Sequence, residues 1–290
     1  MDKTKETPKK IALLTDSCAD MPKMNRPSNL YIVPLRITCG GEEFLDGVNI
    51  SGSDIYAFHE RGELPKTSLP AGEDIEKTFD RIAAEGYDGV IAVMFSSGLS
   101  GTYEFVKMLA EEREMPVKVY DSKNGSLGLS MIILQLALDI EQGADWEYLT
   151  GERVDFLIKN TFAFFSVDSL EYLHKGGRIG YITAAAGTLL GIKPIITFAP
   201  DGKLITAAKV RGSKQLADKL VSLAYEKGKN FPDINIAVAN GGLPAEMEAI
   251  QKELSAALPV YKKCWSGEIG AVLSAHIGKG ILGLAVQILD

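Results

Sequence analysis

Short apolar runs with the composition of buried β-strands alternate with helix-forming stretches along the first half of this chain. The strand-like runs are Ile11–Thr15, Tyr31–Thr38, Val90–Phe95 and Val117–Tyr120. The helical stretches are Asp74–Glu85, Thr102–Glu114, Gly125–Glu141 and Trp146–Asn160. Such alternation is typical of a mostly parallel sheet covered by helices, because parallel neighbours need long crossover connections. We therefore predict an α/β domain with a parallel sheet over residues 1–160.

The pattern changes after residue 160. Phe162–Val167 is predicted as a strand, and Lys193–Val210 as a hairpin around the turn Pro200-Asp201-Gly202. The remaining predicted elements are helices Ser213–Lys227 and Ala245–Leu258, strand Ile234–Ala239, and late strands near Val260 and Val272. These elements predict a second α/β domain over residues 161–290. A cleft at the seam between two such domains is a common place for a ligand.

Composition excludes several classes of protein. The formal net charge of −7 argues against a nucleic-acid-binding protein, which normally carries a basic patch. The longest apolar stretch, Ser126–Ile140, is shorter than the roughly 20 residues of a membrane span. Met1–Lys10 is basic and has no apolar segment behind it, so it does not resemble a secretory signal. The three cysteines are scattered, without the spacing of a zinc site or a disulfide framework. We expect a soluble, cytoplasmic protein that holds no metal.

Ser96–Tyr103, with the sequence Ser-Ser-Gly-Leu-Ser-Gly-Thr-Tyr, joins a buried strand to a predicted helix. Hydroxyl groups and free backbone N–H groups at a helix N-terminus form a favourable site for an anion, either a phosphate or a carboxylate. The alternative is an ordinary helix cap, with Ser100 or Thr102 as the N-cap residue. The motif alone does not distinguish the two interpretations.

Further hydroxyl groups follow two of the predicted strands or precede a predicted helix. They belong to Thr15-Asp16-Ser17, Lys66-Thr67-Ser68 and Tyr120-Asp121-Ser122. Parallel strands end at one edge of a sheet, so these loops are expected to converge there, where open α/β folds bind their ligands. Each motif also has a structural interpretation, as a turn capped by Asp16 or as the start of the helix after Ser68.

Two further motifs carry positive charge or histidine. Leu173–Ile179 holds His174, Lys175 and Arg178 around a double glycine, which suits an anion or an acidic partner but is also typical of a solvated turn. His276 is predicted at the end of a buried strand, where a histidine is more often a hydrogen-bonded structural residue than a catalyst. The sequence has no Gly-x-Ser-x-Gly elbow and no Gly-x-x-x-x-Gly-Lys-Ser/Thr nucleotide loop.

Taken in order, these motifs resemble the DegV family. The resemblance rests on Thr15–Asp20, Lys66–Ser68, Ser96–Tyr103, Asp168–Ile179 and Ala275-His276 with Gly278, and it covers the chain from Lys10 onward. It implies a bacterial protein of two α/β domains with a lipid-binding cleft between them. Family members bind one long-chain fatty acid there and present it to a separate ATP-dependent fatty acid kinase, which makes acyl phosphate for phospholipid synthesis.

The resemblance also implies a set of site residues. Thr67 and Ser97 would donate hydrogen bonds to the carboxylate, Ser96 and the Gly98 amide would lie nearby, and His276 would approach the same head group. Arg178 would lie at the mouth of the cleft, facing the kinase. The chain itself would have no catalytic residues and no cofactor. It departs from the family pattern at Cys18, at Ile277 and Lys279 beside the histidine, and at Gly180.

Two other functions remain open at this stage. One is an acyl- or phosphoryl-transfer enzyme with Ser97 as nucleophile and His276 as base, which would turn over without a partner protein. The other is a protein-interaction module whose buried lipid is only structural.

Overall fold

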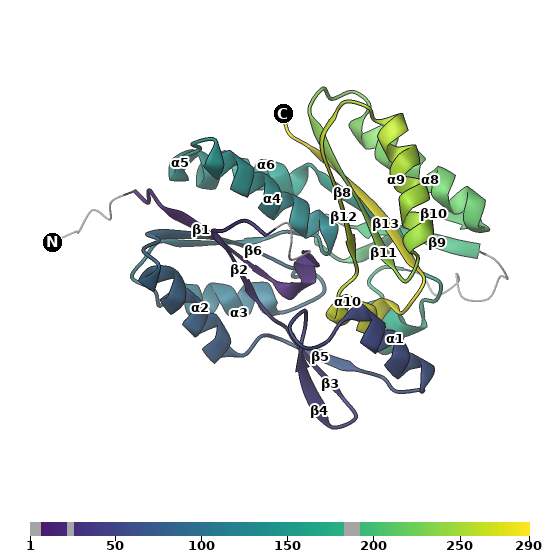
Figure 1. The fold of residues 1–290 in the computed structure, drawn as a ribbon, viewed down its shortest axis with the longest axis horizontal. Coiled ribbons are helices and arrows are strands. Elements are labelled where there is room, and N and C mark those ends of the chain that lie inside the picture. The colour runs from purple at the N-terminus through teal and green to yellow at the C-terminus, as the bar shows by residue number, and fades with distance from the viewer. Residues whose placement is uncertain (1–6, 22–25, 183–191) are drawn as a thin grey trace.

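The computed structural model describes residues 7–21, 26–182 and 192–290, and these residues form an α/β fold with three sheets (Figure 1). The first sheet has four parallel strands in the order β2-β1-β6-β7. They are β1 (Ile11–Asp16), β2 (Leu30–Val33), β6 (Gly89–Met94) and β7 (Val117–Asp121). Every residue of β1 and β6 is buried. This sheet confirms the predicted parallel arrangement, and its two central strands are the most apolar because both of their faces are covered.

The second sheet has six strands in the order β10-β9-β8-β13-β11-β12. They are β8 (Thr161–Ser166), β9 (Ile192–Phe198), β10 (Leu204–Arg211), β11 (Ile234–Gly241), β12 (Tyr261–Glu268) and β13 (Ile281–Ile288). All neighbours are antiparallel except β11 and β12. Its outer face packs against α8 (Ser213–Gly228) and α9 (Pro244–Ala257). The sheet begins at the predicted boundary after residue 160, while the division into two domains stays a prediction.

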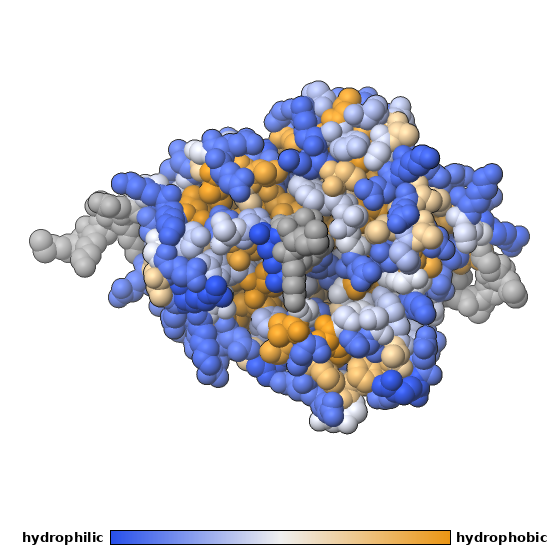
Figure 2. Space-filling model, viewed as in Figure 1, coloured by the Kyte–Doolittle hydropathy of each residue, from blue (hydrophilic) through white to orange (hydrophobic). Residues whose placement is uncertain are grey.

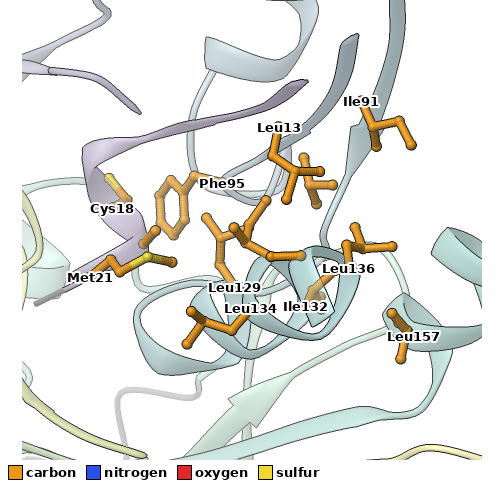
Figure 3. Packing of buried hydrophobic residues seen from close by; sticks show 14 of the residues in the cluster. Leu13, Cys18, Met21, Ile91, Phe95, Leu129, Ile132, Leu134, Leu136 and Leu157 are labelled. Carbon is orange, nitrogen blue, oxygen red and sulfur yellow. The ribbon is translucent and has the colours of Figure 1, made fainter. Parts of the chain in front are cut away.

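Helix α4 (Leu127–Glu141) lies between the two sheets and contacts strands of both. Figure 3 shows Leu129, Ile132 and Leu136 of α4 within the cluster that also holds Leu13 and Ile91 of the parallel sheet. The apolar stretch that is too short to span a membrane is thus a core helix that is buried on nearly all sides. Helices α2 (Gly72–Ala84) and α3 (Thr102–Ala110) cover the opposite face of the parallel sheet.

A buried polar network ties α4 to the larger sheet. The Asn235 side-chain amide donates to Gln135 Oε1 of α4 at 2.8 Å and to Gln287 Oε1 of β13 at 3.0 Å. Gln287 Nε2 in turn donates to Thr161 Oγ1 at 3.0 Å. Buried amides need partners of this kind, so the network fixes how α4 sits on the sheet.

A small lobe projects from the parallel sheet between β2 and α2 (Figure 1). It contains β3 (Arg36–Cys39), β4 (Glu42–Leu45), α1 (Gly52–Glu60) and β5 (Lys66–Ser68), with the strands paired antiparallel in the order β4-β3-β5. Figure 2 shows hydrophobic residues gathered where this lobe meets α10 (Ala271–Ile277), among mostly hydrophilic surroundings. Ile37 of β3 and Ile55 of α1 are buried in the main hydrophobic cluster, so the lobe contributes to the core as well as to the surface.

Several sequence expectations were wrong in detail. The single strand expected at Tyr31–Thr38 is two strands, β2 and β3, separated at Pro34 and belonging to different sheets. The late strand expected near Val272, with His276 at its end, is helix α10. Helix α1 and strand β13 were not predicted. The helix expected at Trp146–Asn160 is α5 (Trp146–Tyr148), a π-helical turn (Leu149–Arg153) and α6 (Val154–Lys159).

Candidate functional site

A cavity of about 290 Å³ lies among α4, the inner face of the larger sheet, the small lobe and α10. Its wall is mostly apolar. Small residues of the sheet provide much of the room, because Ala163 pairs with Ala285 and Gly283 lies between Phe165 and Ala239 across the strands. The larger apolar residues of the wall include Leu99, Leu127, Leu173, Phe198, Leu204, Val272 and Ile281. A cavity with this lining favours a hydrocarbon ligand.

A few polar side chains also line the wall, and three of them lie together. His276 and Thr67 face each other there, and Arg178 is close enough to lower the pKa of His276. Ser68, Ser100 and Ser126 are the other polar residues of the wall. The site is therefore amphipathic, with a cluster of hydrogen-bonding groups beside an apolar chamber.

The His276 imidazole is held on both sides. Its Nε2 lies 2.7 Å from Thr67 Oγ1, and the Cα of Gly176 lies so close that a Cβ there would be 2.4 Å from Nδ1. Burial, with the Arg178 charge as a smaller cause, lowers the pKa of His276 to about 4. The ring is consequently neutral at pH 7, with one nitrogen able to donate and the other able to accept.

Arg178 follows α7 (Glu171–Lys175) and is exposed, while it still contributes to the cavity wall. Its guanidinium donates to the carbonyl oxygens of Leu99 at 3.3 Å and of Gly176 at 2.6 Å. These contacts place a permanent positive charge at the edge of the cavity. Its role at a partner surface stays a prediction.

Ser96 and Gly98 of the predicted anion loop are used for packing. Ser96 is fully buried, and its hydroxyl donates to Gly202 O at 2.8 Å in the β9–β10 turn. The Gly98 amide donates weakly to Ser96 Oγ at 3.3 Å, and a Cβ on Gly98 would be 2.4 Å from the Gly202 backbone. The close approach of the β9–β10 turn therefore explains both small residues.

Ser97 lies outside the cavity wall, which departs from the expectation that its hydroxyl meets the ligand. Its Oγ accepts a hydrogen bond from Lys123 Nζ at 3.1 Å, and its N–H donates to Asp121 Oδ1 at 3.1 Å. The chain turns after Ser96, whose carbonyl accepts from the Leu99 and Ser100 amides. This turn brings Leu99, Ser100 and Gly101 to the cavity instead. Ser100, which the sequence indicated only as a possible N-cap residue, is therefore the serine of this loop that lines the cavity.

The loops after β1, β6 and β7 converge at one edge of the parallel sheet, as predicted, whereas Lys66–Ser68 lies instead in strand β5 of the three-stranded sheet. Asp16 Oδ2 accepts from Phe95 N at 2.7 Å, and its Oδ1 accepts from Cys18 N at 3.0 Å. Asp16 is fully buried, and burial raises its pKa to about 6. Its contacts join the ends of β1 and β6, so its role here is the structural one that the sequence left open.

Other classes of site are not supported by the part of the chain that the structure describes. Within residues 7–21, 26–182 and 192–290, His, Cys, Asp and Glu side chains nowhere form a group of three placed to hold a metal ion. In the same residues, no helix combines the length and apolar character needed to cross a membrane.

A family model and the sequences of known proteins both identify the family of this chain. Residues 10–288 match the family described as "Uncharacterised protein, DegV family". A DegV domain-containing protein of Clostridium acetobutylicum is 36% identical over 279 residues, which cover 96% of this chain and 98% of the relative. A second such protein, from Clostridium perfringens, is 34% identical over 283 residues, with the same two coverages. The chain belongs to the DegV family.

Solved structures of similar proteins share the fold. A fatty-acid-binding DegV family protein from Thermus thermophilus superposes with a TM-score of 0.90 at 31% identity, over 97% of this chain and 100% of that one. A fatty-acid-binding DegV protein from Bacillus subtilis gives 0.85 at 28% identity, over 96% and 99%. A stearic-acid-binding protein from Eubacterium ventriosum gives 0.84 at 27% identity, over 96% and 98%.

Proposed function

We propose that this protein binds one long-chain fatty acid in the cavity, with the carboxylate beside Thr67 and His276. The observation that carries the proposal is the partly buried Thr67–His276 pair in the wall of a mostly apolar chamber. Solved relatives of the same fold that bind fatty acids support it. Each CH₂ buried in the chamber would contribute about 0.8 kcal/mol, so the chain itself would supply most of the affinity.

The polar cluster suits a carboxylate held by neutral donors. When the neutral His276 donates from Nε2 to Thr67 Oγ1, the Thr67 hydroxyl is left to donate to the carboxylate beside the Ser100 hydroxyl, and no cation is buried. Hydrogen bonds to an ionised acceptor are stronger than neutral ones, which favours the carboxylate over an uncharged head group. Arg178 adds a favourable potential from the exposed side without a need to enter the chamber. The arrangement therefore binds a single negative charge with little desolvation of basic groups.

We further propose that the bound acid is presented to an ATP-dependent fatty acid kinase, with Arg178 at the surface that meets it. Phosphorylation of a carboxylate needs a nucleotide, and the sequence has no nucleotide loop of the Walker type. The exposed guanidinium beside the head-group site is placed where a partner could reach both it and the carboxylate. The chain would then act as a carrier rather than as the enzyme.

The alternative of a Ser97–His276 enzyme finds less support in the geometry. A serine nucleophile needs a base in hydrogen-bond contact, whereas the Ser97 hydroxyl accepts from Lys123, which is itself paired with Asp121 at 2.5 Å. His276 forms its contact with Thr67 instead. No observation favours this alternative over binding.

Lipid extraction followed by mass spectrometry tests the proposal directly. The protein is purified, denatured and extracted, and the extract is compared with that of Thr67→Val/His276→Gln protein prepared in parallel. A fatty acid at about one equivalent in the wild type, with less in the double variant, is the expected result. Absence of any fatty acid, together with no binding of added palmitic acid, would overturn the proposal. Incubation with ATP and fatty acid alone should yield no acyl phosphate, and its appearance would favour an enzyme.

A further inference from the structure

Helix α10 carries His276 and is too short to hold its own position. A helix of seven residues is not stable alone, so its place is set by contacts with its surroundings. Its first turn also leaves backbone N–H groups that need acceptors from elsewhere. The position of His276 against Thr67 therefore depends on the residues that hold α10 in place.

Three side chains of one segment hold α10 along its length. Asp46, which follows β4, accepts from Ala271 N at 2.9 Å through its Oδ1. Tyr56 of α1 contacts Ser274 Oγ at 3.1 Å, and Thr67 of β5 contacts His276 at 2.7 Å. All three partners belong to the small lobe or its edges, between residues 46 and 67 of the chain. The lobe thus contacts α10 at its first residue, in its middle and in its last turn.

Asp46 differs from the other two contacts in charge and position. Only 3% of its surface is exposed, and its contact is with the first residue of α10, where a carboxylate interacts favourably with the helix dipole. Ala271 lies five residues before His276, roughly 7.5 Å along a helix axis. A small displacement at this end would therefore be carried to the imidazole.

We propose that Asp46 is a positioning residue for the head-group site, because its carboxylate anchors the start of α10 and thereby sets His276 against Thr67. The inference rests on the proposed function, since it assigns Asp46 an effect on how the carboxylate of a fatty acid is recognised. It acts through α10 and needs no contact between Asp46 and the ligand. Functional groups must be held to within about 0.5 Å by such supporting contacts to work well.

The test compares two ligands that share an apolar chain and differ in the head group, palmitic acid and hexadecanol. Dissociation constants for both are measured with the wild type, Asp46→Ala, Asp46→Asn and a control, Asp54→Asn, which changes an exposed carboxylate of the same lobe. Asp46→Ala should reduce the preference for the acid by about tenfold. Asp46→Asn retains an oxygen acceptor for Ala271 N and should restore most of that preference, while Asp54→Asn should leave it unchanged.

A purely structural role for Asp46 would weaken both ligands together. An unchanged ratio of the two dissociation constants in Asp46→Ala would therefore overturn the inference. If Asp46→Ala does not fold, Asp46→Glu carries the test, because it retains the charge and lengthens the side chain by one methylene. A reduced acid preference in Asp46→Glu supports positioning, and a wild-type preference overturns it. A wild-type protein that binds both ligands equally would instead count against the proposed function itself.

Discussion

Thr67 Oγ1 and His276 Nε2 lie 2.7 Å apart although 209 positions separate the two residues in the chain. The first residue ends the small lobe, and the second lies in the last turn of α10, just before the last strand of the larger sheet. Their contact therefore exists only when the lobe, α10 and both sheets are assembled. A change that separates the lobe from α10 is therefore expected to abolish head-group recognition as well.

Removal of the Thr67 hydroxyl should weaken fatty-acid binding. Thr67→Val keeps the shape of the side chain and removes a hydrogen bond to a charged group, which costs about 1.5–3 kcal/mol. Isothermal titration with palmitic acid measures the change. The wild-type affinity in this variant would show that the carboxylate lies elsewhere in the cavity.

Ser100 and Ser97 should differ in their effect on binding. Ser100 lines the cavity, whereas Ser97 lies outside the wall with its hydroxyl on Lys123. Ser100→Ala should weaken palmitic-acid binding about three- to tenfold, and Ser97→Ala should stay within about twofold. The opposite ranking of the two variants would restore Ser97 to the head-group site that the family resemblance suggested.

Gly176→Ala should disturb the imidazole directly. A Cβ at this position would lie 2.4 Å from His276 Nδ1, so the ring must leave the position in which it contacts Thr67. We expect at least about a tenfold loss of palmitic-acid affinity. Gly151→Ala is the matched control, because no atom lies within 4 Å of the added Cβ there. Equal, small effects of the two substitutions would show that the Gly176 contact is unimportant for binding.

Arg178→Ala should separate fatty-acid binding from kinase coupling. The guanidinium lies at the exposed edge, so palmitic-acid affinity should change by less than about threefold, while phosphorylation by the partner kinase falls sharply. Loss of its charge should also raise the pKa of His276 from about 4, although burial will still hold it below the usual value. NMR titration of the imidazole measures this shift. Collapse of lipid binding with normal coupling of the bound fraction would place Arg178 in the head-group site.

The stability of Asp46→Asn relative to the wild type should increase with pH. Burial raises the pKa of Asp46 to about 6 from an ordinary 3.8, so the folded state binds the proton more tightly than the unfolded state. The resulting stabilisation is complete below about pH 4 and is lost as the pH rises through 6. Asparagine resembles the protonated form at every pH, and it also removes charge repulsion with the buried Asp16 and Asp20.

Urea unfolding of both proteins at pH 4.5 and pH 8 checks this expectation. The difference in unfolding free energy should move in favour of the variant by roughly 1–3 kcal/mol across that range. Asp54→Asn is a useful contrast, because hydrogen bonds from Ser51 lower the pKa of Asp54. That variant should differ from the wild type by a nearly constant amount between pH 4.5 and pH 8, because the stabilisation by ionised Asp54 is complete above about pH 4. Parallel behaviour of the two variants would contradict the assigned direction for Asp46.

Sequence patterns predicted those parts of the fold that depend on local periodicity. Strands β1 and β6 and helix α4 are examples. Each is almost entirely apolar and is buried in the structure, so its local sequence was enough to identify it. Convergence of the loops after β1, β6 and β7 also follows from the sequence, because parallel strands end at one edge. The motifs at Thr67, Arg178 and His276 identified the family and three residues of the cavity wall.

What only the tertiary structure decided is the direction in which individual side chains point. Ser97 and Ser100 lie three residues apart in one loop, and a turn closed on the Ser96 carbonyl sends one toward Lys123 and the other toward the cavity. His276 was expected at a strand end and is on a helix, because its short apolar segment fits either element and long-range contacts with the lobe decide between them. The sequence by itself therefore determined the layers and the family, while contacts between residues far apart in the chain determined the head-group site.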